Sequence, residues 1–124
     1  APLQLLRNNG NGTFSDITRA ARLDRRGHAV AVAPTDFDNH RDVDLLVVYR
    51  DGPPALFANQ RDGTFRDVAP QVGLTVGLPE GGEVTAVALG DVNKDDWPDL
   101  FLGGARESVL ALSNGRGRLE MSPA

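Results

Sequence analysis

The sequence predicts an all-β fold of antiparallel strands, and three observations carry this prediction. Short apolar runs rich in Val, Leu and Ala recur along the 124 residues. Turn-forming residues separate these runs, since the chain contains 14 Gly and 8 Pro, a pattern typical of many short strands. The chain also repeats itself, because an acidic loop that begins at residue 36 recurs at residue 91, an offset of 55 residues. Such a repeat indicates tandem supersecondary units.

The first elements follow from local composition. Residues 3–7 are predicted to form a strand, and residues 13–18 the strand that returns after a tight turn of Asn and Gly, which tolerate positive φ. The segment 18–26 carries four Arg and is interpreted as a solvated connection, with a basic docking patch as the alternative. Residues 28–35 hold an uninterrupted Ala/Val run, which predicts a strand buried on both faces.

The later strands are bounded by the same turn signals. The segment 69–82 is rich in Gly and Pro and is predicted to be a connector. A second motif, at residues 8–17, recurs at residues 59–68 with an offset of 51, and residues 114–119 are a third copy predicted to be one residue shorter. The remaining predicted strands are 44–49, 55–59, 64–68, 83–90, 99–103, 108–114 and 118–121.

The loop at residues 91–99 presents oxygen donors at regular spacing. Asp91, Asn93, Asp95 and Asp99 occupy positions 1, 3, 5 and 9, and the backbone carbonyl of Trp97 stands at position 7. Calcium prefers six to eight oxygen ligands of these kinds, so the spacing predicts a calcium site. It is not an EF-hand, because position 12 lacks the bidentate Glu and the flanks are predicted strands. The alternative is that Asp and Asn only form the turn.

The repeated unit has four antiparallel strands, and such units in tandem are typical of the blades of a β-propeller. The segments 9–18 and 62–69, together with Val72-Gly73-Leu74, resemble the FG-GAP and VCBS repeats of integrin-α-like propellers. Within that family the resemblance is closest to the branch that includes cartilage acidic protein and the bacterial ASPIC/UnbV proteins. It covers nearly the whole chain, and the acidic loop combined with the G-T-F-x-D-V turn carries it.

The resemblance implies one calcium ion in each well-formed loop of the pattern D-x-D-x-D-G-x-x-D. The loop at 91–99 departs from it by an Asn at position 3 and by Asp96 in place of Gly. The loop at 36–44 departs further, since a His replaces the carboxylate at position 5 and Arg41 replaces Gly. Imidazole is a poor calcium ligand, so this loop is predicted to be a weak or empty site. Its candidate ligands are Asp36, Asp38, His40, Asp42 and Asp44.

The predicted architecture is half a blade at residues 1–18, a full blade at 28–68 and a second, nearly full blade at 83–121. Propellers close with four to eight blades, so these are too few to close a ring. The chain begins at Ala1 rather than Met, which is the expectation for a piece of a longer protein. We therefore predict either a homo-oligomer that closes a ring or part of a longer propeller chain.

Composition narrows the function classes. The formal net charge is −4, which gives no basis for nucleic-acid binding, and the apolar runs are too short to span a membrane. No Ser lies in a nucleophile-elbow context, so no catalytic residues are predicted. We predict a secreted or cell-surface, non-enzymatic binding or scaffold module whose protein or glycan ligand is unknown. The alternatives are a carbohydrate-binding propeller, in which Tyr49 or Trp97 stacks on a sugar, and a non-catalytic part of a larger enzyme.

Overall fold

The computed structural model describes residues 2–75, 78 and 84–123. Part of the predicted connector at 69–82 and the first residue of the strand predicted at 83–90 lie outside these residues. No helix within them has the length and apolar character needed to cross a membrane. The elements are β1 (Leu6–Asn8), β2 (Phe14–Asp16), β3 (Ala29–Thr35), β4 (Asp44–Tyr49), β5 (Ala55–Asn59), β6 (Phe65–Asp67), α1 (Ala69–Val72), β7 (Val84–Gly90), β8 (Asp99–Gly104), β9 (Ser108–Ser113) and β10 (Leu119–Pro123).

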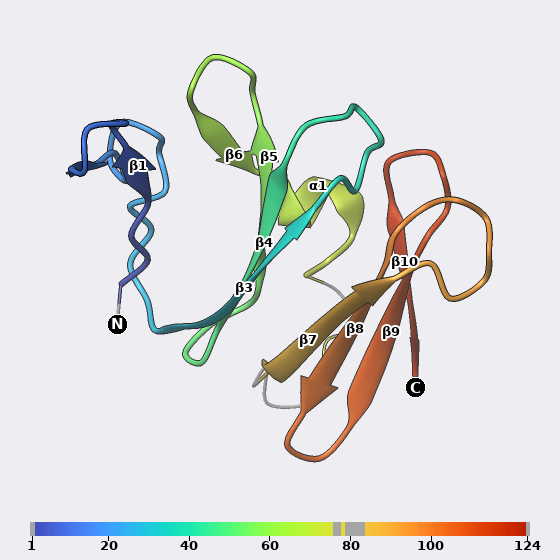
Figure 1. The fold of residues 1–124 in the computed structure, drawn as a ribbon. Helices are drawn as coiled ribbons and strands as arrows, with labels where there is room; N and C mark the ends of the chain where they lie inside the picture. The colour runs from blue at the N-terminus through green and yellow to red at the C-terminus, as the bar shows by residue number, and fades with distance from the viewer. Residues whose placement is uncertain (1, 76–77, 79–83, 124) are drawn as a thin grey trace.

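The strands form three antiparallel sheets in which neighbours in sequence are neighbours in space. The first sheet pairs β1 with β2, the second has the order β3-β4-β5-β6, and the third has the order β7-β8-β9-β10. Figure 1 shows the two four-stranded sheets side by side, with β1 and its hairpin on the far side of the β3–β6 sheet. The arrangement is open, and it confirms the predicted antiparallel all-β fold with propeller-like blades.

The offset of 55 residues found in the sequence also relates the two four-stranded sheets. A β-bulge interrupts the β3–β4 pairing just after Ala29 and the β7–β8 pairing just after Val84, the same repeat position. The last residue of each acidic loop, Asp44 or Asp99, lies opposite the final residue of the preceding strand. The two loops therefore join the same strands in the same register.

The main hydrophobic core lies between the two four-stranded sheets. Leu46 and Leu56 project from one sheet, and Leu100 and Leu102 from the other, all fully buried. The helix α1 closes this core with Ala69 and Val72, and Leu74 follows it into the same cluster. Burying a Leu side chain stabilises a fold by about 1.5–3 kcal/mol, so this contact is the main force that holds the sheets together.

A second core covers the opposite face of the β3–β6 sheet. Val47, Tyr49 and Phe57 pack there against Ala21 and Leu23 of the N-terminal connection. The strand β4 is consequently buried on both faces. The N-terminal connection is thus more than the solvated segment that its four Arg predicted, because Ala21 and Leu23 form one side of this core.

The two connections that leave the outer strands have one local structure, which follows the repeat offset of 51. The amide of Ala21 donates to Ile17 O at 2.8 Å, and the amide of Val72 donates to Val68 O at 3.0 Å. Each turn then delivers one fully buried Leu to a core, namely Leu23 or Leu74. The prediction had placed only a connector after residue 68, where the structure has α1. This helix is four residues long, too short to leave a periodic signal in the sequence.

Three hairpins join the third and fourth strands of the units, and all have the same length. In each, one amide donates to the carbonyl four residues later: Asn9 to Thr13, Gln60 to Thr64, and Asn114 to Arg118, at 2.9–3.0 Å. The prediction that the third copy is one residue shorter is therefore wrong. Its first residue is Ser113, which takes the place of the Asn that begins the other two copies.

The prediction that the Ala/Val strand is buried on both faces is also wrong. Val30 and Val32 of β3 are each 47% exposed, whereas the alternate Ala residues pack against the cores. The reason is that β3 is the end strand of its sheet. Its burial alternates, as in a strand that is covered on one side only.

The outer face of the β7–β10 sheet has no covering layer among the described residues. Phe101 is 38% exposed on this face, and the neighbouring Leu110 is partly exposed. At the other end of the chain, Leu6 and Phe14 are also exposed. The residue of the β3–β6 sheet that corresponds to Phe101 is Leu46, which is fully buried. The face that carries Leu46 is covered by the β7–β10 sheet.

The sequence predicted either a homo-oligomer or part of a longer propeller chain, and we propose that a second copy covers this outer face in solutions of the chain. Head-to-tail contact would bring the exposed residues of the two ends together. We expect light scattering after size exclusion to give a mass that rises with concentration, and Phe101→Ser to lower it. A monomeric mass that is the same at all concentrations would contradict this proposal.

Candidate metal site

The two acidic loops share one backbone conformation, although neither has the Gly of the family pattern. Asn39 and Arg41 have φ of 57° and 65°, and their repeat equivalents Lys94 and Asp96 have φ of 61° and 69°. Left-handed φ is unfavourable for residues that have a Cβ, by about 1–2 kcal/mol. Both sequences adopt it nonetheless, so the departures at Arg41 and Asp96 leave the turn geometry intact.

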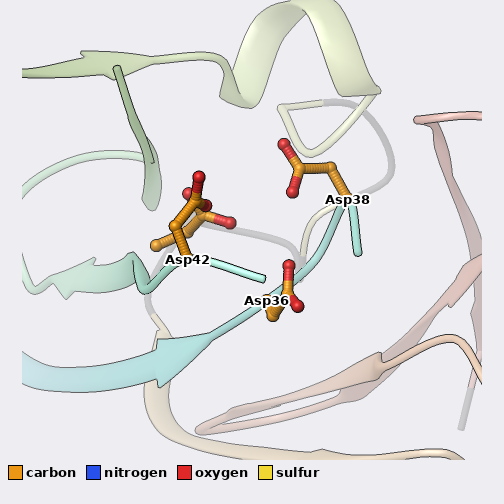
Figure 2. Close-up of side chains that lie close together, drawn as sticks. Asp36, Asp38 and Asp42 are labelled. Atoms are coloured by element: carbon orange, nitrogen blue, oxygen red, sulfur yellow. The ribbon is translucent and has the colours of Figure 1, made fainter. Parts of the chain in front are cut away.

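The structure brings the carboxylates of the first loop together. Asp36, Asp38, Asp42 and Asp44 each offer an oxygen atom, and these oxygens all lie within 4.8 Å of one another. Figure 2 shows the side chains of Asp36, Asp38 and Asp42 close together around the loop that joins β3 to β4. Asp44, the first residue of β4, is fully buried. Four like charges this close repel one another unless a cation or a proton neutralises them.

Three of these carboxylates are each anchored through one oxygen by a donor from the protein. The donors are a backbone amide of the loop, a backbone amide of β5 and a guanidinium of the β5–β6 hairpin. The bonds are Arg41 N to Asp36 Oδ2 at 3.1 Å, Asn59 N to Asp44 Oδ1 at 2.8 Å and Arg61 Nε to Asp42 Oδ2 at 2.6 Å.

The other oxygen of each of these three carboxylates is buried and accepts no hydrogen bond from any described residue. These atoms are Asp36 Oδ1, Asp42 Oδ1 and Asp44 Oδ2. Buried polar atoms are almost always hydrogen-bonded, and a buried charge without a partner is costly. Three such oxygens in one cluster therefore form an oxygen-rich site that a hard cation fits.

Burial also changes the acidity of the innermost carboxyl group. It raises the pKa of Asp44 to about 6, and the negative charges of Asp38, Asp42 and Asp36 add to the rise, while the hydrogen bond from Asn59 N opposes it. A proton on Asp44 is therefore the alternative to a bound cation.

His40, predicted as a candidate ligand, lies beside the cluster. Its Nδ1 is 2.8 Å from Asp38 Oδ2, and its amide donates to Asp38 Oδ1 at 3.2 Å. The imidazole side chain is 65% exposed. Asp38 thus has both oxygens engaged by one residue, which distinguishes it from the three carboxylates that keep a free oxygen.

The second loop, predicted to be the better site, has a different hydrogen-bond pattern. Both oxygens of Asp91, Asp95 and Asp99 accept hydrogen bonds, and Asn93 donates one of them. For example, Asp99 Oδ1 accepts from Ser113 N at 2.9 Å and Asp99 Oδ2 from Val92 N at 3.0 Å. Among the described residues, its carboxylates do not form a group of the kind seen in the first loop. Its use as a metal site stays a prediction.

The two aromatic residues considered for sugar stacking lie in packed positions. Tyr49 is 1% exposed, and the guanidinium of Arg25 lies over its ring, 4.2 Å from the centroid. The interpretation of Tyr49 as a stacking surface is therefore wrong. Trp97 packs its indole on Gly115 so closely that a Cβ there would lie 2.9 Å from Nε1.

A cavity of about 500 Å³ adjoins the first loop. Phe37, Val68 and Val72 give it an apolar lining, while the guanidinium of Arg66 and the amide of Gln71 are among its polar groups. Asp38 and Asp42 also line it, so the carboxylate cluster and the cavity share a wall.

Sequence reasoning missed Asn59 and Arg61, which anchor two of the cluster carboxylates from a different hairpin. Asn59 N bonds Asp44 and its side-chain amide donates to Val43 O at 3.2 Å. A signal for Arg61 was present, because the two matching hairpins have Gly10 and Gly115 at its position. An arginine at a position where the other two hairpins have Gly indicates that its side chain makes a contact that the other hairpins lack.

Asp44 should make the metal-free protein lose stability as pH rises. Its folded pKa of about 6 exceeds its ordinary value of 3.8, so the native state holds the proton more tightly. This contribution, up to about 3 kcal/mol, is complete below pH 4 and disappears as pH rises through 6. We expect chemical denaturation in chelator to show the free energy of unfolding fall with pH more steeply for the unmodified chain than for Asp44→Asn. The comparison between the two proteins serves to subtract the contributions of other titrating groups. Parallel pH profiles for the two proteins would contradict the assignment.

Comparison with known proteins places these observations in a family. A model of the FG-GAP-like repeat matches residues 36–102, which include both acidic loops and more than half of the chain. The chain is also 35% identical over 77 residues to cartilage acidic protein 1 of Xenopus tropicalis. That alignment covers 62% of this chain and 11% of the relative, so the chain spans a small part of that protein's length. The chain belongs to the FG-GAP-like repeat family.

Proposed function

We propose that the chain is a calcium-binding module and that the β3–β4 loop holds the ion. The observation that supports this most strongly is the set of three buried carboxylate oxygens without donors among the described residues, on Asp36, Asp42 and Asp44. Their atoms lie within one cluster with Asp38. Carboxylate oxygens are the ligands that calcium prefers, and the family match over both loops agrees with this proposal.

The role of the ion would be structural. A divalent cation supplies the positive charge that offsets the repulsion of the four carboxylates. Asp36 follows β3, Asp44 begins β4, and Asp44 is bonded to the last residue of β5. The cluster residues would therefore tie three strands of one sheet together at a single point.

We further propose that the module acts by binding rather than by catalysis, as a scaffold or adhesion domain outside the cell. The name of the relative, cartilage acidic protein 1, refers to cartilage, a tissue rich in extracellular matrix, and this supports an extracellular location. Extracellular calcium-binding modules work with dissociation constants of about 10⁻⁴–10⁻³ M. A weak site, in which His40 replaces a carboxylate, would belong to this affinity range.

Carbohydrate binding is the second candidate function, and the cavity beside the loop favours it. Its apolar lining and its rim of amide, guanidinium and carboxylate groups are the chemistry that a sugar requires. A glycan array probed with the chain, in calcium and in chelator, separates this function from a purely structural calcium site. Binding that needs calcium would place the glycan beside the loop.

Calcium should stabilise the folded chain through the first loop. An ion that binds only the folded state adds about 2.7 kcal/mol at a concentration of one hundred times the dissociation constant. We expect thermal unfolding to shift upward in calcium relative to chelator, and Asp36→Asn to remove the shift. Asp91→Asn, the matched change at position 1 of the second loop, should retain it. Coincident curves for the unmodified chain would rule out a calcium site, and the opposite response of the two variants would move the site to the second loop.

Restoring the family pattern should tighten the first site. His40→Asp adds the missing carboxylate at position 5, and Arg41→Gly removes a positive charge and suits the left-handed φ of 65°. We expect calorimetry to give a lower calcium dissociation constant for this double variant. An unchanged constant, or two equally tight sites in the unmodified chain, would contradict the prediction.

A further inference from the structure

Arg61 occupies a backbone position that favours Gly. Its φ is 61°, and the matching residues of the other two hairpins are Gly10 and Gly115, with φ of 78° and 66°. A residue with a Cβ is less favourable there by about 1–2 kcal/mol. Backbone conformation therefore does not explain the arginine, and an outlier of this kind directs attention to its side chain.

The Arg61 side chain contacts the acidic loop at two points. Its Nε lies 2.6 Å from Asp42 Oδ2, and its Nη2 donates to the backbone carbonyl of His40. These contacts fix the Asp42 carboxylate from one side only. The other oxygen, Asp42 Oδ1, stays buried without a donor from the described chain.

The second repeat supplies an internal comparison. The residue that corresponds to Asp42 there is Trp97, and the residue that corresponds to Arg61 is Gly115. Trp97 packs directly on Gly115, which leaves no space for a side chain. The two positions therefore differ as a pair: a carboxylate faces a guanidinium in one repeat, and an indole faces Gly in the other.

We propose that Arg61 is the positioning residue of the cation site. It binds Asp42 Oδ2 and thereby directs Asp42 Oδ1 toward Asp36 and Asp44. The carboxylate at position 7 then replaces the one that the loop lacks at position 5, where His40 stands. This inference rests on the proposed calcium binding, and it assigns to Arg61 the orienting role of a partner that holds a metal ligand from outside.

The exposure of Arg61 separates positioning from stability. The Arg61 side chain is 61% exposed and that of Asp42 15% exposed. An ion pair of this kind adds little to folding stability. Replacing the Arg61 side chain should therefore leave the fold intact and change only the position of the Asp42 carboxylate.

The test measures calcium affinity of the full chain by calorimetry. Arg61→Gly, which installs the residue of the other hairpins, should weaken binding about 10- to 100-fold, the effect of losing a partner that orients a metal ligand. Arg66→Ala is the matched control, since it removes the same charge from the lining of the same cavity. It should leave the affinity close to that of the unmodified chain. Equal or tighter binding by Arg61→Gly would overturn the inference.

A double-mutant cycle shows whether Arg61 acts through Asp42. In an Asp42→Asn background, Arg61→Gly should change the affinity by less than about twofold, because the group that it orients has already been altered. A full effect in that background would overturn the positioning role. If the unmodified chain binds no calcium, the proposed function itself fails and this inference falls with it. Calcium binding that is insensitive to Arg61 overturns the inference alone.

Discussion

Mutual repulsion among four carboxylates is the constraint on which the organisation of this blade depends. One oxygen from each of four residues lies within 4.8 Å of the other three, namely from Asp36, Asp38, Asp42 and Asp44, and Asp44 is fully buried. The fold opposes the repulsion with donors from three places: the loop itself, the end of β5 and the β5–β6 hairpin. Among the described residues, these donors leave one oxygen without a partner on each of three carboxylates. The fold thus assembles an oxygen-rich site that could hold a cation, and a proton on Asp44 is the alternative.

The repeated unit supplies the frame that holds these groups. The β3–β6 sheet packs both of its faces on neighbouring layers, and the β7–β10 sheet packs one. The connections after β2 and β6 each place a Leu in a core between layers. The acidic loops lie at the ends of the first two strands, where the register is the same in both sheets. The chemistry therefore varies by substitution within a constant backbone. The first loop keeps carboxylate oxygens without donors from the described residues, whereas in the second loop both oxygens of Asp91, Asp95 and Asp99 accept hydrogen bonds.

Much of the fold could be predicted from the sequence because repeats, turn residues and apolar runs are local signals. The strands, the Asn-Gly hairpins and the resemblance to FG-GAP repeats all follow from them. Local signals were not sufficient to decide which of the two loops is the better candidate for a metal site. Ligand types at positions 1, 3, 5 and 9 favour the loop at 91–99, but the hydrogen bonds of Asp99 and the contribution of Asp42 at position 7 depend on contacts made after folding. Arg61 and Asn59 approach the site from another hairpin, so no spacing within the loop reveals them.

The most direct measurement of the central claim is anomalous diffraction from crystals of the chain grown with calcium. We expect one strong peak in the β3–β4 loop, with oxygens of Asp36, Asp42 and Asp44 at about 2.3–2.6 Å from it. The bond between Arg61 and Asp42 should be retained in the same map. A peak confined to the loop at 91–99, or free oxygens of Asp36, Asp42 and Asp44 that contact only water, would contradict the assignment of the site.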